Sequence, residues 1–170
     1  MARLRLSKER TPEIGEDDRR MIERAIDLAR RAGEIGEIPV GAVIYRGREV
    51  IAEAANNREA TADPTGHAEM VALRRAGERL GGWRLEGCSM AVTLEPCPMC
   101  AGALVNARLE RVVYGAFDPK AGACSSLFRI PEDRRLNHRV DMIGGVEESR
   151  CAELLREFFR RRRAEKRRVV

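Results

Sequence analysis

Hydrophobic positions recur with helical spacing in several parts of the chain. From about Asp17 to Ala32, apolar residues return every three or four positions on one face, and Gly33 follows as a stop signal. We expect three further helices: about His67 to Leu80, about Pro98 to Ala107, and a C-terminal one that begins near Glu147. In this last helix, leucine and phenylalanine pairs recur at helical spacing before a run of arginines.

Short apolar runs between these helices predict strands. Pro39 to Tyr45 and Val50 to Ala55 flank a polar turn and are typical of a hairpin. Two more strands are expected, Ser89 to Leu94 and Arg111 to Gly115, which pair in parallel because a helix connects them. The alternation predicts an α/β protein with three layers, in which helices cover both faces of a five-stranded mixed sheet.

Length and composition indicate one domain. With 170 residues, 44% of them hydrophobic, the chain can bury one ordinary core. We expect a loosely ordered extension over residues 1–16, a single domain over 17–165 and a tail over 166–170. No apolar run resembles a secretory signal or spans a bilayer, so we expect a cytoplasmic protein with no membrane partner. The five cysteines, with one Cys-x-x-Cys pair, favour metal or redox chemistry over disulfides.

The positive charge is confined to the C-terminus. The whole chain carries a formal net charge of +5, and residues 151–170 alone account for it. Cations are favourable at a helix C-terminus, so this basic segment has a plain explanation as a solvated helix end. The alternative is an arm that contacts phosphates, for which the candidates are Arg160, Arg161, Arg162 and Arg163. With only 4% aromatic residues, the chain is poorly suited to serial base stacking, so any nucleic acid would be held by its phosphates, with one base in a pocket.

Two motifs point to a metal site. His67-Ala-Glu69 stands at a predicted helix start, and Pro96-Cys-Pro-Met-Cys100 stands thirty residues later, where a strand passes into a helix. Cys97 and Cys100 lie one helical turn apart, and a first turn favours their thiolate form. One imidazole and two thiolates neutralise one zinc ion per subunit and leave the fourth tetrahedral position to water, as in catalytic sites.

The spacing of His67 and Glu69 adds a geometric prediction. Residues two apart lie about 200° apart around a helix and cannot share a groove along its side. They can converge only if the site lies off the N-terminal end of the helix. We therefore expect two helix N-termini to point at one metal, with Glu69 beside it as a proton shuttle and not as a ligand.

A closed structural zinc site is the alternative. It would need a fourth ligand from outside the two motifs, for which the candidates are Cys88, Cys124, Cys151 and His138. None of these forms a second Cys-x-x-Cys pair, and a closed site gives Glu69 no role. We expect the three cysteines to be buried as small apolar residues and His138 to be structural.

The motifs resemble those of the cytidine-deaminase-like superfamily, in which His-x-Glu followed by Pro-Cys-x-x-Cys marks the zinc nucleobase deaminases. Within it, the chain is similar to the bacterial tRNA-specific adenosine deaminases from about residue 17 to 165. Beyond the zinc motifs, the likeness rests on Pro39-Val-Gly-Ala-Val, Asn56, Asp63-Pro-Thr-Gly, Val113-Tyr-Gly-Ala-Phe-Asp-Pro-Lys-Ala-Gly-Ala, Arg135-Leu-Asn-His and Phe158-Phe-Arg.

This resemblance implies a function and a set of site residues. The family converts the wobble adenosine of a tRNA anticodon to inosine and works as a homodimer, so the implied partners are an anticodon stem-loop and a second subunit. His67, Cys97 and Cys100 would bind zinc, and Glu69 would transfer protons. The residues implied to contact the substrate are Asn56, Val40, Leu94, Phe117, Asp118 and Lys120. The chain departs from many members at Thr61-Ala62, where a basic residue or histidine is common.

Two other functions remain open from the sequence. A deaminase of free guanine or of a cytosine nucleoside or nucleotide shares the zinc site but does not need the basic arm. The other hypothesis is a non-catalytic RNA-binding module stabilised by a structural zinc ion, which predicts four protein ligands and no turnover.

Overall fold

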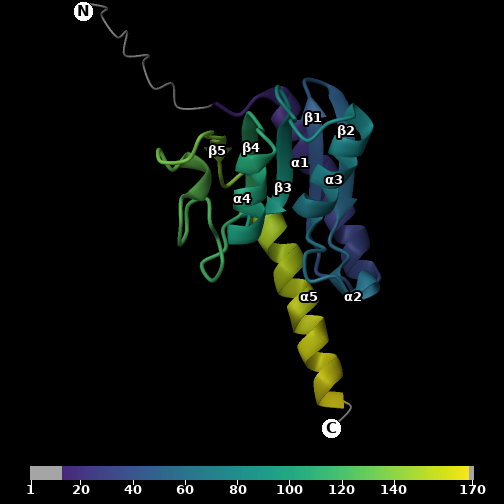
Figure 1. Cartoon of the computed structure of the whole chain (residues 1–170). Helices are drawn as coiled ribbons and strands as arrows, with labels where there is room; N and C mark the ends of the chain where they lie inside the picture. Colours follow the sequence, from purple (N-terminus) through teal and green to yellow (C-terminus); the bar gives the residue numbers. More distant parts are fainter. Residues whose placement is uncertain (1–12, 169–170) are drawn as a thin grey trace, which may run out of the picture.

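The computed structural model describes residues 13–168 and contains one five-stranded sheet (Figure 1). The strand order is β2-β1-β3-β4-β5. The strands are β1 Gly41–Arg46, β2 Glu49–Ala55, β3 Ser89–Leu94, β4 Arg111–Ala116 and β5 Asp141–Ile143. β1 is antiparallel to both β2 and β3, whereas β4 is parallel to both β3 and β5. The sheet is therefore mixed, and the predicted parallel pairing of β3 and β4 is confirmed.

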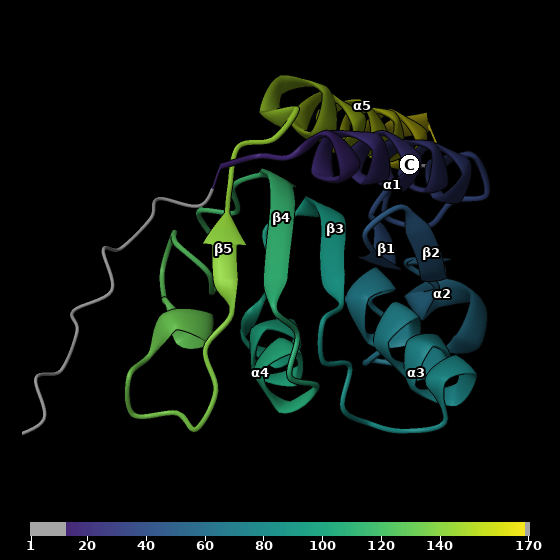
Figure 2. The same cartoon turned by 90° about the horizontal axis from the view of Figure 1, so that it is seen from above.

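Helices cover both faces of this sheet. They are α1 Glu16–Glu34, α2 Arg58–Thr61, α3 Ala68–Leu80, α4 Pro98–Asn106 and α5 Glu148–Arg168, with a 3₁₀ turn at Ile130–Glu132. Figure 2 shows α1 and α5 together on one face and α3 and α4 on the other. The predicted three-layer α/β/α arrangement is confirmed. The predicted ends of the first three helices and of the four strands, and the predicted start of the C-terminal helix, lie within two residues of those observed. α5 continues to Arg168 and so includes residues 166–168 of the predicted tail.

Two elements were not located by the sequence pattern. β5 has only three residues, none of them fully buried, and it pairs with the first half of β4 at the sheet edge. α2 has four residues and buries none of them. Neither is long enough, or apolar enough on one face, to show a periodic pattern.

Alternation along the central strands divides the core between the two helical layers. Ile44 and Val92 pack in the cluster on the side of α3 and α4, whereas Val43 and Ala91 pack against α1. Successive side chains of a strand point to opposite faces, so these buried strands are apolar throughout. The α1 layer lies very close to the sheet: a Cβ built on Gly41 would be 2.2 Å from the carbonyl oxygen of Ala25.

The topology brings several chain segments to one end of the sheet. The start of β1 lies beside the end of β3, because Ala42 pairs with Val92 in antiparallel register. β4 ends beside β3, where Leu94 pairs with Ala116. Residues 1–12, most of the predicted loose extension, and residues 169–170 of the predicted tail lie outside the described residues. Within residues 13–168, no helix is long and apolar enough to cross a membrane.

Candidate active site

Two helices begin at this end of the sheet and carry the two motifs. His67 is the residue before α3, and Cys97 is the residue before α4. Both have an extended backbone, with φ −75° and ψ 147° at His67 and φ −73° and ψ 173° at Cys97. Pro98 starts α4, where its fixed φ and missing N–H are favourable. The two helix N-termini thus converge, as the motif spacing predicts.

His67, Cys97 and Cys100 form a compact donor cluster. The Nδ1 atom of His67 lies 3.6 Å from Sγ of Cys97 and 3.5 Å from Sγ of Cys100. All three donor atoms lie within 4.8 Å of one another. Tetrahedral zinc with ordinary bond lengths places a nitrogen and a sulfur ligand about 3.6 Å apart. Both nitrogen–sulfur distances therefore fit a zinc ion held by these three side chains.

The charge state of the two thiols suits a cation. The hydrogen bond with Cys100, reinforced by the His67 ring, lowers the pKa of Cys97 to about 4. The same contact, together with burial, raises the pKa of Cys100. Zinc binds cysteine as the thiolate, so a bound ion would displace the proton of Cys100.

Glu69 lies next to this cluster in the first turn of α3. It is only 3% exposed, and among the described residues its Oε2 atom has no hydrogen-bond partner. Burial raises the pKa of the Glu69 carboxyl above its ordinary range. A buried carboxyl oxygen without a partner is costly to the fold and is typical of a group that transfers protons at a reaction site.

The structure does not support a closed four-ligand site. Within residues 13–168, no fourth histidine, cysteine or acidic side chain joins the cluster. Cys88, Cys124 and Cys151 are free and buried, as expected for apolar packing. His138 lies elsewhere, and its Nε2 is 2.7 Å from the carbonyl oxygen of Leu109.

A cavity of about 430 Å³ opens beside the cluster. His67, Glu69 and Cys97 line it, and so do all six residues that the resemblance assigns to the substrate: Val40, Asn56, Leu94, Phe117, Asp118 and Lys120. The remaining lining residues were not predicted: Ile38, Arg58, Ala68, Glu95, Ala121, Leu155 and Phe159. The i, i+4 spacing of Leu155 and Phe159 was visible in the sequence, but the sequence does not show that α5 passes the cavity.

Glu95 anchors one wall of the cavity. It is 2% exposed, and its carboxylate accepts backbone N–H bonds from Asp118 at 3.0 Å, Cys124 at 3.1 Å, Ser125 at 2.7 Å and Ser126 at 2.9 Å. The Ser126 hydroxyl also donates to it. Burial opposes ionisation of Glu95, but these hydrogen bonds outweigh it and hold the pKa below its usual value. The carboxylate thereby orders the loop after β4.

This loop carries three of the predicted substrate contacts. Oδ1 of Asp118 accepts the backbone N–H groups of Lys120 at 2.9 Å and Ala121 at 3.2 Å, so this oxygen stabilises the turn. Phe117 is 41% exposed and packs edge to face on Tyr114, with 5.4 Å between ring centroids. Lys120 is exposed at the rim. The loop thus offers an aromatic face and a cation beside the cavity.

The predicted basic arm occupies the end of α5 that extends away from the sheet (Figure 1). Arg160, Arg161, Arg162 and Arg163 are exposed, and none forms an ion pair with another described residue. Arg162, Arg163 and Lys166 line a shallow depression that shares Ile38 and Phe159 with the cavity. Two of the four predicted arginines therefore lie next to the site.

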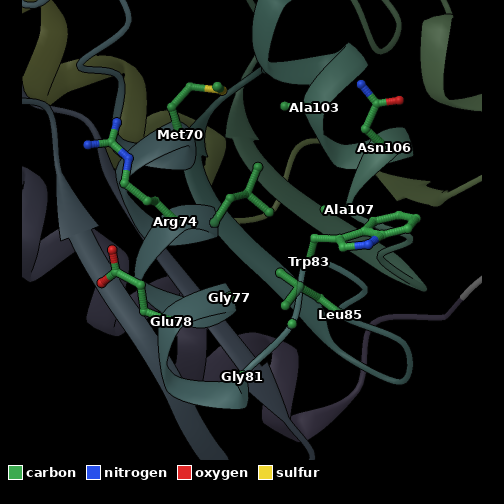
Figure 3. Close-up of a pocket in the computed structure, with 12 residues that line it drawn as sticks. Met70, Arg74, Gly77, Glu78, Gly81, Trp83, Leu85, Ala103, Asn106 and Ala107 are labelled. Atoms are coloured by element: carbon green, nitrogen blue, oxygen red, sulfur yellow. The ribbon is translucent and has the colours of Figure 1, made fainter.

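A second hollow lies between α3 and α4. Figure 3 shows Met70 and Arg74 of α3 on one side of this groove and Ala103 and Asn106 of α4 on the other. Trp83, which is 62% exposed, and Leu85 also line it. The groove is mainly apolar and its lining contains no histidine or cysteine, so it has no evident chemistry.

Comparison with known proteins places the chain in a family. The model of the cytidine and deoxycytidylate deaminase zinc-binding region matches residues 15–116. The tRNA-specific adenosine deaminase of Bacillus subtilis (strain 168) is 46% identical over 149 residues, which cover 88% of this chain and 92% of the relative. That of Aquifex aeolicus is 48% identical, with 82% and 91% of the two chains covered.

Solved structures give the same result. One from a study of A-to-I editing by tRNA:A34 deaminases is 44% identical and superposes with a TM-score of 0.77 over 80% of this chain and 99% of the other. A guanine deaminase from Bacillus subtilis is 41% identical, with a TM-score of 0.56 over 58% of this chain and 63% of the other. By its fold, its zinc-binding motifs and these relatives, the chain belongs to the cytidine and deoxycytidylate deaminase family.

Proposed function

We propose that this protein is a zinc-dependent enzyme that converts adenosine to inosine at the wobble position of a tRNA anticodon, and that it acts in the cytoplasm. The observation that carries the proposal is the buried Glu69 carboxyl, whose Oε2 has no partner among the described residues, beside three zinc-ligating side chains in an open cavity. The choice of substrate is supported by the relatives named tRNA-specific adenosine deaminase.

His67, Cys97 and Cys100 would hold the zinc ion. When bound, zinc supplies a Lewis acid that makes water a competent nucleophile near neutral pH. The net reaction consumes one water and releases ammonia, so both protons of the water must be transferred, one to the ring nitrogen and one to the departing amine.

Glu69 is the group placed to move that proton. It would take one proton from the attacking water and deliver it to the ring nitrogen next to the reacting carbon. It would then take the second proton from the added hydroxyl group and deliver it to the departing amine. Its raised pKa suits both roles, since the carboxyl can hold a proton at a pH where an ordinary glutamate is ionised.

The remaining lining residues would hold the base and its neighbours. Val40 and Leu94 offer apolar contact to a ring, and Asn56 offers a hydrogen-bonding amide. Phe117 and Lys120, which also line the cavity, would contact a flanking nucleotide. The basic depression next to the cavity would receive phosphates of the stem.

A substrate panel tests this proposal. Zinc-loaded protein is incubated with an anticodon stem-loop that carries adenosine at the wobble position, and separately with free adenosine, guanine and cytidine. Inosine is measured in the RNA and ammonia in all reactions. We expect inosine in the stem-loop and negligible ammonia from the free compounds. Faster release from guanine or cytidine would identify a small-substrate deaminase, and no turnover at all would favour the RNA-binding module.

We also propose that the protein is a homodimer, as the family resemblance implies. The exposed apolar groove between α3 and α4 is a suitable contact face, because burying Trp83 and its neighbours stabilises association (Figure 3). Light scattering should give twice the chain mass for the wild type and for Trp83→Phe, and a lower mass for Trp83→Asp. A monomeric wild type would refute the dimer.

A further inference from the structure

A further buried carboxyl, that of Glu37, lies behind the cavity and has no role in the chemistry described above. Glu37 is 2% exposed and does not line the cavity. It follows the C-terminus of α1, where Gly36 adopts φ +88° and the Glu37 N–H donates to the carbonyl oxygen of Ala32 at 3.0 Å. This left-handed turn is a common helix ending that favours glycine. It turns the chain inward and brings the Glu37 side chain to Asn56.

Every described group that hydrogen-bonds to the Glu37 carboxylate is a donor. Oε1 accepts the backbone N–H of Ala60 at 2.7 Å. Oε2 accepts the side-chain Nδ2 of Asn56 at 2.8 Å and the backbone N–H of Glu59 at 3.4 Å. Both carboxylate oxygens are therefore used as acceptors.

This contact determines which way the Asn56 amide faces. An asparagine amide has an oxygen and an NH₂ group of nearly equal size, and shape alone does not distinguish its two orientations. A carboxylate can only accept, so it must face the NH₂ group. The Asn56 backbone is itself fixed, since its N–H donates to the carbonyl oxygen of Val40 at 3.0 Å. Only the amide orientation remains to be set.

We propose that Glu37 is a positioning residue that locks the Asn56 amide in one orientation and so sets the donor and acceptor pattern that the substrate base meets. This inference rests on the proposed function, in which Asn56 holds the base. One Asn56 side-chain N–H donates to Glu37, and this contact holds the second N–H and the amide oxygen at fixed places for the base. A flipped amide would exchange donor for acceptor at those places.

Glu37→Gln tests the lock directly. The introduced amide must place an NH₂ group where one carboxylate oxygen was. At the Oε1 position it meets the Ala60 N–H, which donates at 2.7 Å, and at the Oε2 position it meets the Asn56 amide and the more distant Glu59 N–H at 3.4 Å. Asn56 can relieve the second conflict by turning its oxygen toward the introduced NH₂ group, whereas the backbone cannot turn. We therefore expect the variant to populate the flipped Asn56 amide.

A double-mutant cycle separates this role from a general structural one. On the wobble-adenosine stem-loop, Glu37→Gln should lower kcat/KM roughly tenfold, mainly through KM, with unchanged zinc content. In an Asn56→Ala background the same change should cost less than about twofold, because there is no amide left to orient. The control Glu34→Gln removes an exposed charge three residues earlier and should match the wild type.

Each outcome is decisive. An equal loss in both backgrounds, or no loss in the wild-type background, would overturn the inference. If the wild type and Glu34→Gln fail to deaminate the stem-loop, the proposed function fails first, and the inference falls with it.

A measurement on the zinc-loaded wild type covers the case in which Glu37→Gln does not fold. The side-chain NH₂ signals of Asn56, assigned by their absence in Asn56→Asp, should exchange slowly with solvent because one proton is bonded to a buried carboxylate. Rapid exchange of both protons would contradict the lock.

Discussion

The metal cluster and the basic arm are built in opposite ways. In the cluster, Cys100 is fully buried and Glu69 nearly so, and the helix starts that carry them are fixed by the strand that precedes α4 and by the turn before α3. In the arm, Arg162 and Arg163 are exposed on a helix that extends past the sheet, without ion pairs to other described residues.

This difference separates two tasks. Proton transfer needs donor atoms held within fractions of an ångström, and only packed surroundings provide that. Phosphate binding needs charge at an approximate place and tolerates mobile side chains. The buried cluster accounts for the type of reaction. The exposed arginines of the arm would bind the phosphates of a substrate as large as tRNA.

Replacing Glu69 should have the largest effect. Glu69→Gln keeps the size of the side chain but cannot carry the proton, so turnover should fall by roughly 10²–10⁴-fold. Zinc content should stay at one ion per chain, because Glu69 is not among the ligands. Both are measured on the same preparation, with Glu86→Gln, an exposed glutamate, as the matched control. Retained activity would show that another group moves the proton.

Replacing Glu95 tests the role of the loop after β4, which lies beside the metal cluster. In Glu95→Gln an NH₂ group faces backbone N–H donors of the loop, at a cost of about 1–3 kcal/mol in the free energy of unfolding. The loop carries Phe117 and Lys120, so KM for the stem-loop should rise several-fold while the zinc content stays constant. Denaturant unfolding and steady-state kinetics check this. An unchanged KM would mean that the loop does not contact the substrate.

Changes in the arm should have the smallest effect. Arg162→Gln combined with Arg163→Gln should weaken binding of full-length tRNA several-fold and reduce its salt dependence by about one to two units. Turnover of saturating stem-loop should not change. Arg20→Gln combined with Arg48→Gln, at the opposite end of the sheet, removes the same charge as a control. Equal salt dependence of tRNA binding in both double variants would mean that the arm does not contact phosphates and is only a solvated helix end.

The sequence was most informative where side-chain type and spacing carry the meaning. The strand β3 was predicted with its observed bounds, and the spacing of His67 and Glu69 required convergence at helix N-termini, which the structure has. The six residues implied to contact the substrate all line one cavity, although their roles remain predictions.

The sequence was least informative where side chains are held by hydrogen bonds from backbone groups. Glu37 and Glu95 are held by main-chain N–H groups from distant segments, and such donors leave no pattern of residue types. From the sequence, Phe159 was an apolar position of a terminal helix and part of the Phe158-Phe-Arg likeness, with no predicted place at the site. Its place at the cavity depends on how α5 crosses the sheet, which periodicity does not determine.

Zinc K-edge X-ray absorption on the zinc-loaded protein tests the central claim most directly, because it counts the atoms around the ion. We expect two sulfur ligands, one imidazole and one further light atom from solvent. Three or more sulfur ligands, or a second imidazole from His138, would mean that side chains close the site and would contradict a catalytic centre there.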